Sequence, residues 1–145
     1  MISDQLSKAL IVSMIGPTEP EKRIDIVGSW IALEYAENRG AAFGLLVGLG
    51  PMLTVGSIVV IGVLLFHQLR TLDPPLKETL ATGAIVGGAV GNLADRVRLD
   101  YVIDFVSVGA WPNFNVADSA ITLGVAVAIW SWLFRRDEQS AALTP

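Results

Sequence analysis

Long apolar stretches alternate with short polar stretches along this chain of 145 residues. No charged side chain occurs between Gly40 and Phe66, and residues 51–69 are long enough as a helix to cross a hydrocarbon core of roughly 30 Å. Two later apolar runs are shorter and need the polar residues beside them to complete a crossing. The pattern predicts a mainly α polytopic membrane bundle, a single domain over residues 1–145 with three visible spans at residues 51–69, 77–96 and 115–134.

The basic residues indicate how these spans are oriented. They lie in the loop after the first span and in the carboxyl-terminal tail, which both belong on the cytoplasmic side: Arg70, Lys77, Arg135 and Arg136. The polar ends of the second and third spans then face outward. The amino-terminal segment is left outside with no helix before it, since its apolar piece at residues 9–16 is too short to span. We expect a further apolar helix upstream of Asp4 that this sequence lacks; the alternative is translocation by the first visible span.

The composition becomes polar between the amino-terminal segment and the first span. Residues 17–39 contain an alternating stretch in which Ile31, Leu33 and Tyr35 share one face, as in a strand. This predicts a small extracytoplasmic β element. Aromatic side chains of the outer segments either anchor at the membrane surface or pack in the core of this sheet, and the sequence leaves both interpretations open for Trp30, Tyr35 and Trp111.

Composition narrows the chemistry that is available. Hydrophobic residues make up 52% of the chain and charged residues 17%, and the mean hydropathy of +0.57 favours a bilayer over water as the solvent. A net charge of −4 leaves no basic surface for a nucleic acid. Without cysteine, and with a single His67 near the cytoplasmic end of its span, thiol catalysis, a histidine metal centre and a Ser-His-Asp system are disfavoured. We expect no metal and no cofactor, and we interpret His67 as structural.

Polar side chains gather at the outward ends of the second and third predicted spans. Asn92 and Arg96 lie one helical turn apart with Asp95 beside them, and Asn115 and Asp118 share one face where the last span begins. Taken singly, each has a plain structural explanation. The first group can mark a membrane boundary and the second can cap a helix.

Asp104 differs because apolar residues flank it on both sides, at positions 102, 103, 105 and 106. Burial raises the pKa of such a carboxyl group unless it finds a partner, and the nearest credible partner is Asp118. Two adjacent carboxyl groups share one proton and so offer a base and an acid together, as in aspartic proteases. A cation or proton site of a transporter is an alternative use of the same pair.

Three glycines recur every four residues along the second predicted span. Gly83, Gly87 and Gly91 form a smooth stripe, which predicts close packing of another helix. The spacing does not match the Gly-x-Gly-x-x-Gly fingerprint of dinucleotide-binding sites, so a nucleotide is not indicated.

Five motifs in this order resemble those of the lipoprotein signal peptidases, the type II signal peptidases of bacterial membranes. They are DQLSK at residues 4–8, NRGAAFG at 38–44, GGAVGNLADR at 87–96, VIDF at 102–105 and FNVADSA at 114–120. The resemblance covers nearly the whole chain.

This resemblance implies that Asp104 and Asp118 are the catalytic pair of an aspartic endopeptidase. It implies cleavage of prolipoproteins before a cysteine that carries a diacylglyceryl group. Further positions would line or support the substrate site, with Arg96 holding a backbone carbonyl through its planar fork of donors: Asp4, Asn38, Gly40, Asn92, Asp95, Arg96 and Asn115.

The family resemblance also sets expectations for topology and partners. It implies four spans with both termini in the cytoplasm, and a sheet that cradles the substrate at the outer surface of the bacterial inner membrane. Prolipoproteins and membrane lipid would be the partners, nucleic acid would not, and we expect a monomer. The alternatives are a small carboxylate-gated ion or proton carrier and a non-catalytic assembly subunit.

Overall fold

The computed structural model describes residues 1–19, 22–40 and 50–142. Its helices are α1 (Ile2–Ile15), α2 (Gly50–Arg70), α3 (Leu76–Leu99) and α4 (Val116–Ala142). Its strands are β1 (Arg23–Val27), β2 (Ile31–Asn38), β3 (Val102–Val108) and β4 (Trp111–Phe114). The prediction of a mainly helical chain with a small sheet is confirmed. Residues 41–44 of the second motif lie outside the described residues.

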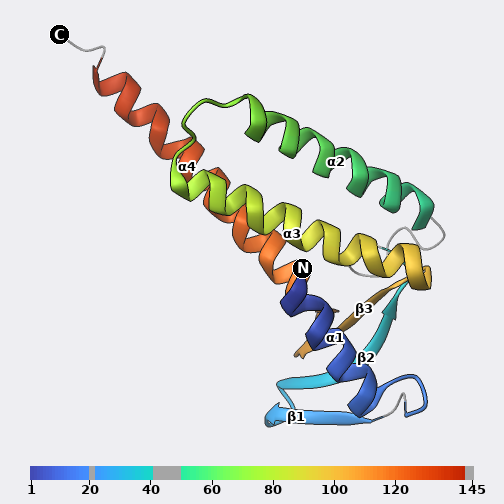
Figure 1. Cartoon of the computed structure of the whole chain (residues 1–145). Coiled ribbons are helices and arrows are strands. Elements are labelled where there is room, and N and C mark those ends of the chain that lie inside the picture. Colours follow the sequence, from blue (N-terminus) through green and yellow to red (C-terminus); the bar gives the residue numbers. More distant parts are fainter. Residues whose placement is uncertain (20–21, 41–49, 143–145) are drawn as a thin grey trace.

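The three long helices form the body of the molecule. α3 packs against both α2 and α4, while α1 and the sheet lie together on one side of them, next to the end of α3 (Figure 1). α3 begins directly after Pro75, whose ring cannot continue a preceding helix. It ends where Asp100 adopts a left-handed conformation and donates its N–H to the carbonyl of Arg96. This stop directs the chain from α3 into β3.

Two of the described helices are long and apolar enough to cross a membrane. They are α2 over its full length and α4 over Val116–Phe134. α2 has no buried residue, and its large apolar side chains project away from the protein, as expected for a helix surrounded by lipid. α3 carries acidic and basic residues near both ends and is not among the candidate spans, so its crossing stays a prediction.

The sheet is an antiparallel meander in the order β1-β2-β3-β4. β1 and β2 fall within residues 17–39, but the two further strands were not anticipated from the sequence. β3 is buried along most of its length, so it lacks the alternation of apolar and polar residues that marks a half-exposed strand. Its pairing places Ala36 opposite Asp104 and Asn38 opposite Val102, which carries Asn38 to the edge of the site.

α1 was underestimated in the sequence as a short apolar piece. The helix runs from Ile2 to Ile15, and Ile11 and Ile15 pack with Phe105 in the core beneath the sheet. The same face of α1 buries two charged residues, Asp4 and Lys8. Because charged residues occupy part of its buried face, α1 lacks the apolar periodicity that predicts a helix.

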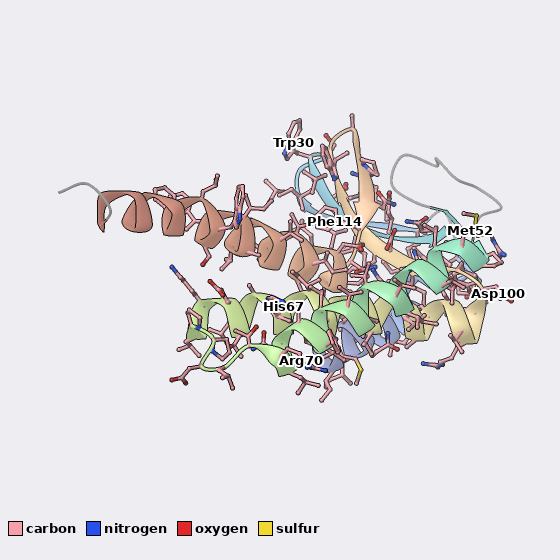
Figure 2. All side chains as sticks on the ribbon, turned by 90° about the horizontal axis from the view of Figure 1, so that it is seen from above. Trp30, Met52, His67, Arg70, Asp100 and Phe114 are labelled. Carbon is pink, nitrogen blue, oxygen red and sulfur yellow. The ribbon has the colours of Figure 1, made fainter. Side chains whose placement is uncertain are left out.

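The two tryptophans of the outer segments, Trp30 and Trp111, do not pack in the core. Trp30 is 65% exposed and Trp111 is 64% exposed, so the core-packing interpretation is wrong for both tryptophans. Trp30 projects outward from the hairpin between β1 and β2 (Figure 2). Tyr35 is half-buried and shares a hydrogen bond of 3.0 Å with the hydroxyl group of Tyr101. His67 lies at the end of α2 opposite Met52, away from the sheet (Figure 2).

The glycine stripe of α3 allows another helix to approach closely at one of its ends. A methyl group on Gly83 would meet no atom within 4 Å, and Gly91 faces Asp4 of α1. The close approach to α4 occurs instead at Gly88, where a Cβ atom would lie 2.5 Å from the carbonyl oxygen of Ala117. The predicted close approach of another helix therefore occurs at Gly91, against α1, while the approach of α4 occurs at Gly88, outside the stripe.

We predict that Gly88→Ala separates α3 from α4 and lowers stability by about 1–3 kcal/mol, because backbone atoms must move to admit the methyl group. The midpoint of thermal unfolding in detergent measures the effect. Gly83→Ala is the matched control, and its midpoint should not fall, since open space surrounds that position. Equal losses in the two variants would contradict the assignment of this contact.

Candidate active site

Asp104 lies on β3 and is almost completely buried, with 2% of its surface exposed. Asn38 donates from Nδ2 to Asp104 Oδ2 over 2.9 Å, and Asn115 donates from Nδ2 to Asp104 Oδ1 over 2.6 Å. The backbone N–H of Gly40 donates to Asn38 Oδ1 over 3.0 Å. This last bond fixes the amide of Asn38 with its donor end toward the carboxyl group, which explains the place of Gly40 in the site.

Asp118 lies in the first turn of α4. Asn92 donates from Nδ2 to Asp118 Oδ1 over 2.7 Å, and the backbone N–H of Asn115 donates to Asp118 Oδ2 over 3.2 Å. The backbone N–H of Asp118 in turn donates to Asn115 Oδ1 over 2.9 Å. Asn115 and Asp118 therefore form a capping box at the start of α4, as their spacing allows.

Asn115 joins the two carboxyl groups. Its side chain donates to Asp104 and its backbone N–H donates to Asp118, while none of its own surface is exposed. One residue can reach both acids only if they lie within a few ångströms of each other. Asn115 therefore caps α4, as the structural interpretation expects, and also contacts both carboxyl groups.

The environment of Asp104 changes its acidity. Burial, the largest cause, and the neighbouring charge of Asp118 together raise the pKa of Asp104 to about 6, against the opposing effect of the N–H donors of Asn38 and Asn115. A carboxyl group with this pKa retains its proton far more often near neutral pH than an exposed aspartate does. The pair can therefore hold one proton between two acids.

A second buried network lies directly behind this pair. The ammonium group of Lys8 contacts Asp4 Oδ2 at 3.0 Å, Asp95 Oδ2 at 2.7 Å and Asn92 Oδ1 at 2.9 Å. All four residues are buried. Asp4 also accepts the backbone N–H of Ala117 over 3.0 Å, which ties α1 to the start of α4. Three of the residues that the sequence suggested for the site, Asp4, Asn92 and Asp95, therefore lie together around Lys8.

Lys8 was not among the candidate site residues. The available signal was the spacing of Asp4 and Lys8, which places opposite charges one turn apart within an otherwise uncharged segment. Asp95 shows a further function of this network, because its Oδ2 accepts the backbone N–H of Ile103 over 3.3 Å. That bond holds the residue that precedes Asp104.

Arg96 lies apart from the hydrogen-bonded groups. Its guanidinium group interacts electrostatically with Asp118, Asp104 and Asp95, yet among residues 1–19, 22–40 and 50–142 that group makes no hydrogen bond or ion pair. It borders a separate cavity with Gly50, Pro51, Thr54, Val55, Val97 and Asp100. The N–H donors of its guanidinium group therefore lie near the acids but do not form hydrogen bonds with them.

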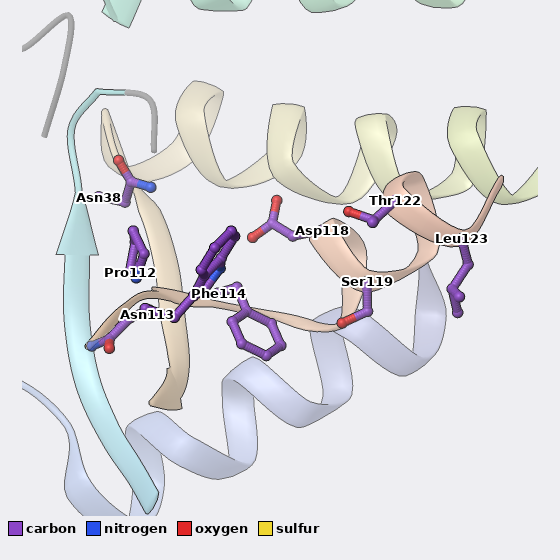
Figure 3. Close-up of a pocket in the computed structure, with 9 residues that line it drawn as sticks. Asn38, Pro112, Asn113, Phe114, Asp118, Ser119, Thr122 and Leu123 are labelled. Carbon is purple, nitrogen blue, oxygen red and sulfur yellow. The ribbon is translucent and has the colours of Figure 1, made fainter. Parts of the chain in front are cut away.

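A cleft of about 560 Å³ opens beside Asp118 (Figure 3). Its walls come from the end of β2, from β4 and from the first turns of α4, and they comprise Asn38, Trp111, Pro112, Asn113, Phe114, Asp118, Ser119, Thr122 and Leu123. Asp104 does not line the cleft, but Asn38, which donates a hydrogen bond to it, does. One wall of the cleft is formed by α4, a helix long and apolar enough over Val116–Phe134 to cross a membrane.

Within the described residues no group of three or more His, Asp or Glu side chains is arranged to hold a metal ion. A buried carboxyl pair with fixed amide donors beside an apolar cleft is the arrangement of an aspartic hydrolase, and here it sits at the end of a membrane helix bundle. This combination defines the class of protein as a membrane-bound aspartic hydrolase.

Comparison with known proteins identifies the family. The model of the signal peptidase (SPase) II family matches residues 1–134. Lipoprotein signal peptidases of Syntrophomonas wolfei and Moorella thermoacetica are 40% and 41% identical to this chain, covering 97% and 94% of it and 93% and 89% of their own lengths. Two solved structures of bacterial membrane enzymes superpose with TM-scores of 0.86 and 0.81 at 27% and 28% identity. They cover 94% and 91% of this chain and 84% and 86% of their own.

The chain belongs to the signal peptidase II family. It is a membrane aspartic peptidase that removes signal peptides from prolipoproteins. The resemblance of its five motifs to this family is therefore confirmed, and the carrier and assembly-subunit alternatives are set aside.

We predict that Lys8→Met destabilises the protein by about 3–5 kcal/mol, because it leaves the buried carboxylates of Asp4 and Asp95 without a counter-charge. The midpoint of thermal unfolding in detergent is the measurement. Lys22→Met is the matched control: it also removes an ion pair, to Glu19 at 2.8 Å, but one that is well exposed, and its cost should stay below about 1 kcal/mol. A Lys8 variant as stable as the control would show that the buried pairs are energetically neutral.

Proposed function

We propose that Asp104 and Asp118 are the catalytic pair of this peptidase. The observation that carries the proposal is the bridging of both carboxyl groups by Asn115, which holds two acids from separate segments at one place. Each acid also accepts a second amide N–H, from Asn38 or from Asn92. These donors leave the carboxyl groups little freedom to rotate, as a reaction that needs fixed geometry requires.

The unequal exposure of the two acids suggests which one is protonated and which one acts as the base. Asp104 is buried and has its pKa raised to about 6, so it carries the shared proton. Asp118 borders the cleft and acts as the ionised base. Asp118 takes a proton from water while the water oxygen attacks the carbonyl carbon of the scissile peptide bond. Asp104 donates a hydrogen bond to the carbonyl oxygen.

The second half of the reaction returns both acids to their starting states. The tetrahedral intermediate collapses, the carbon–nitrogen bond breaks, and the proton that Asp118 took from water passes to the leaving amine. Asp104 ends with its proton as it began. The overall change is the addition of one water molecule across the peptide bond, and every step uses groups that the chain itself supplies.

The cleft suggests how a lipid-modified substrate is received. Its walls are mainly apolar, with Trp111, Phe114 and Leu123 beside the acidic end, and α4 connects it to the bilayer. We propose that the diacylglyceryl group of the substrate cysteine stays in lipid against α4, while the peptide reaches Asp118. Within the described part of the chain the guanidinium donors of Arg96 have no partner and lie near the acids, which suits Arg96 to hold a backbone carbonyl of the substrate.

The same considerations support the remaining proposals on topology. Basic residues at the far end of the bundle favour a cytoplasmic location for that end, so the acids and the sheet face outward from the bacterial inner membrane. We propose four spans, with α3 as one of them, and both termini in the cytoplasm, as the family resemblance implies. This topology is compatible with that orientation. We retain the monomer as the working state.

We predict that Asp104→Asn and Asp118→Asn each lower cleavage of a lipidated precursor by at least about a thousandfold, since each removes a proton-transfer group. The assay is cleavage by purified protein in detergent, with unfolding midpoints measured in parallel. Asp100→Asn is the matched control, because Asp100 is exposed, lies four positions before Asp104, and has a left-handed conformation that asparagine tolerates. Near-normal cleavage by either active-site variant would disprove the pair.

The raised pKa of Asp104 predicts the pH dependence of cleavage. Above this pKa the shared proton is lost, so kcat/KM should fall as the pH rises through about 6. Asn38 stabilises the ionised form of Asp104, so Asn38→Ala should raise that pKa and move the alkaline limb to higher pH. Asn113→Ala also removes an amide from the cleft but bonds Glu34 rather than either acid, and should leave the limb in place. A limb that stays fixed in Asn38→Ala would contradict the assignment.

A further inference from the structure

Lys8 is the only cation that the described part of the chain buries completely, with 2% of its surface exposed. Two of its three partners are carboxylates, Asp4 and Asp95, and the third is the neutral side chain of Asn92. A lysine that served only to neutralise acids would need no amide partner. The contact with Asn92 therefore requires an explanation of its own.

The amide of Asn92 connects Lys8 with the active site. Asn92 Oδ1 accepts from Lys8 Nζ over 2.9 Å and from Asn115 Nδ2 over 3.1 Å, while Asn92 Nδ2 donates to Asp118 Oδ1 over 2.7 Å. An ammonium group can only donate, so it holds the oxygen end of the amide toward itself. If the amide rotated by half a turn, its NH₂ group would face the ammonium and its oxygen would face the carboxylate.

We infer that Lys8 is a positioning residue for the catalytic pair, acting through Asn92 to keep an N–H donor directed at Asp118. The inference rests on the proposed function of Asp104 and Asp118. It assigns to the buried network behind the site a function in catalysis in addition to its contribution to stability. Lys8 holds the pair in its singly ionised state at lower pH than two carboxyl groups would otherwise allow.

Several charged and titratable groups face Lys8 and the pair, and they define the electrostatic setting. The charged groups on the inner side are Asp4 of α1, Asp95 and Arg96 of α3, Asp104 of β3 and Asp118 of α4. On the other side, a cavity of about 330 Å³ beside Lys8 is bordered by Tyr35, Arg98 and Tyr101. Asp4 and Asp95 add negative charge near the pair. Lys8 is the buried charge that offsets them and favours ionisation of the acids.

The position of Lys8 predicts which kinetic constant it controls. Lys8 lies behind Asn92 and does not line the cleft beside Asp118. A change at Lys8 should therefore alter kcat and the pH profile while leaving KM close to its original value. A merely structural lysine would change the amount of folded enzyme and neither of these quantities.

The test uses the full chain in detergent with a lipidated precursor as the substrate. Because Lys8→Met alone leaves two unpaired carboxylates, it is made together with Asp4→Asn, which restores the original net charge of the Asp4, Lys8 and Asp95 cluster. Asp4→Asn alone is the reference. Lys22→Met serves as the control for loss of a lysine at an exposed site.

We expect the pH profile of kcat in Lys8→Met/Asp4→Asn to move upward by about one pH unit relative to Asp4→Asn. At the original optimum, kcat should fall roughly tenfold with KM changed less than twofold. Asn92→Ala alone should move the profile in the same direction. In the Asn92→Ala background the effect of the Lys8 change should become smaller, as coupled positions require.

Two results would overturn the inference. An unchanged profile in folded Lys8→Met/Asp4→Asn would make Lys8 purely structural, and a shift of full size in the Asn92→Ala background would remove Asn92 from the connection. Failure of the proposed function is recognised separately, because in that case Asp104→Asn and Asp118→Asn would still cleave the precursor.

Discussion

The site depends on the confinement of two carboxyl groups around one buried asparagine. Asn115 reaches Asp104 through its side chain and Asp118 through its backbone, and the capping box with Asp118 fixes Asn115 at the start of α4. Helix initiation and alignment of the acids are thus accomplished by the same hydrogen bonds. Asp104 comes from the sheet, on strand β3. Because β3 is buried at this position, the pKa of Asp104 is raised.

The buried charges behind the pair explain how an apolar protein maintains such a site. Lys8 and its carboxylate partners connect α1 with α3, and Asp4 connects α1 with the start of α4. Buried ions are tolerated only when each has its partners, and here every described buried polar side-chain atom has one. The small contact residues Gly88 and Gly91 let the helices approach closely enough for these short bonds.

The sequence indicated which acids and amides would lie close together, but it could not predict the residues that support them. Asp104 was recognisable because a carboxyl group within an apolar run needs a partner, and Asn115 and Asp118 because of their spacing. β3 was missed because a strand buried on both faces shows no alternation, and Lys8 because its partners come from a distant helix. The four-residue spacing of the α3 glycines indicated the close approach of another helix, found at Gly91, but it does not reveal which neighbour each glycine meets.

If Asp104 and Asp118 hold one proton between them, infrared difference spectroscopy on protein with ¹³C-labelled aspartate detects it. We expect a protonated-carboxyl band equivalent to one aspartate, which titrates with an apparent midpoint near 6 and is lost in Asp104→Asn. Full ionisation of both acids throughout the pH range of cleavage, or a band that persists unchanged in Asp104→Asn and Asp118→Asn, would contradict it.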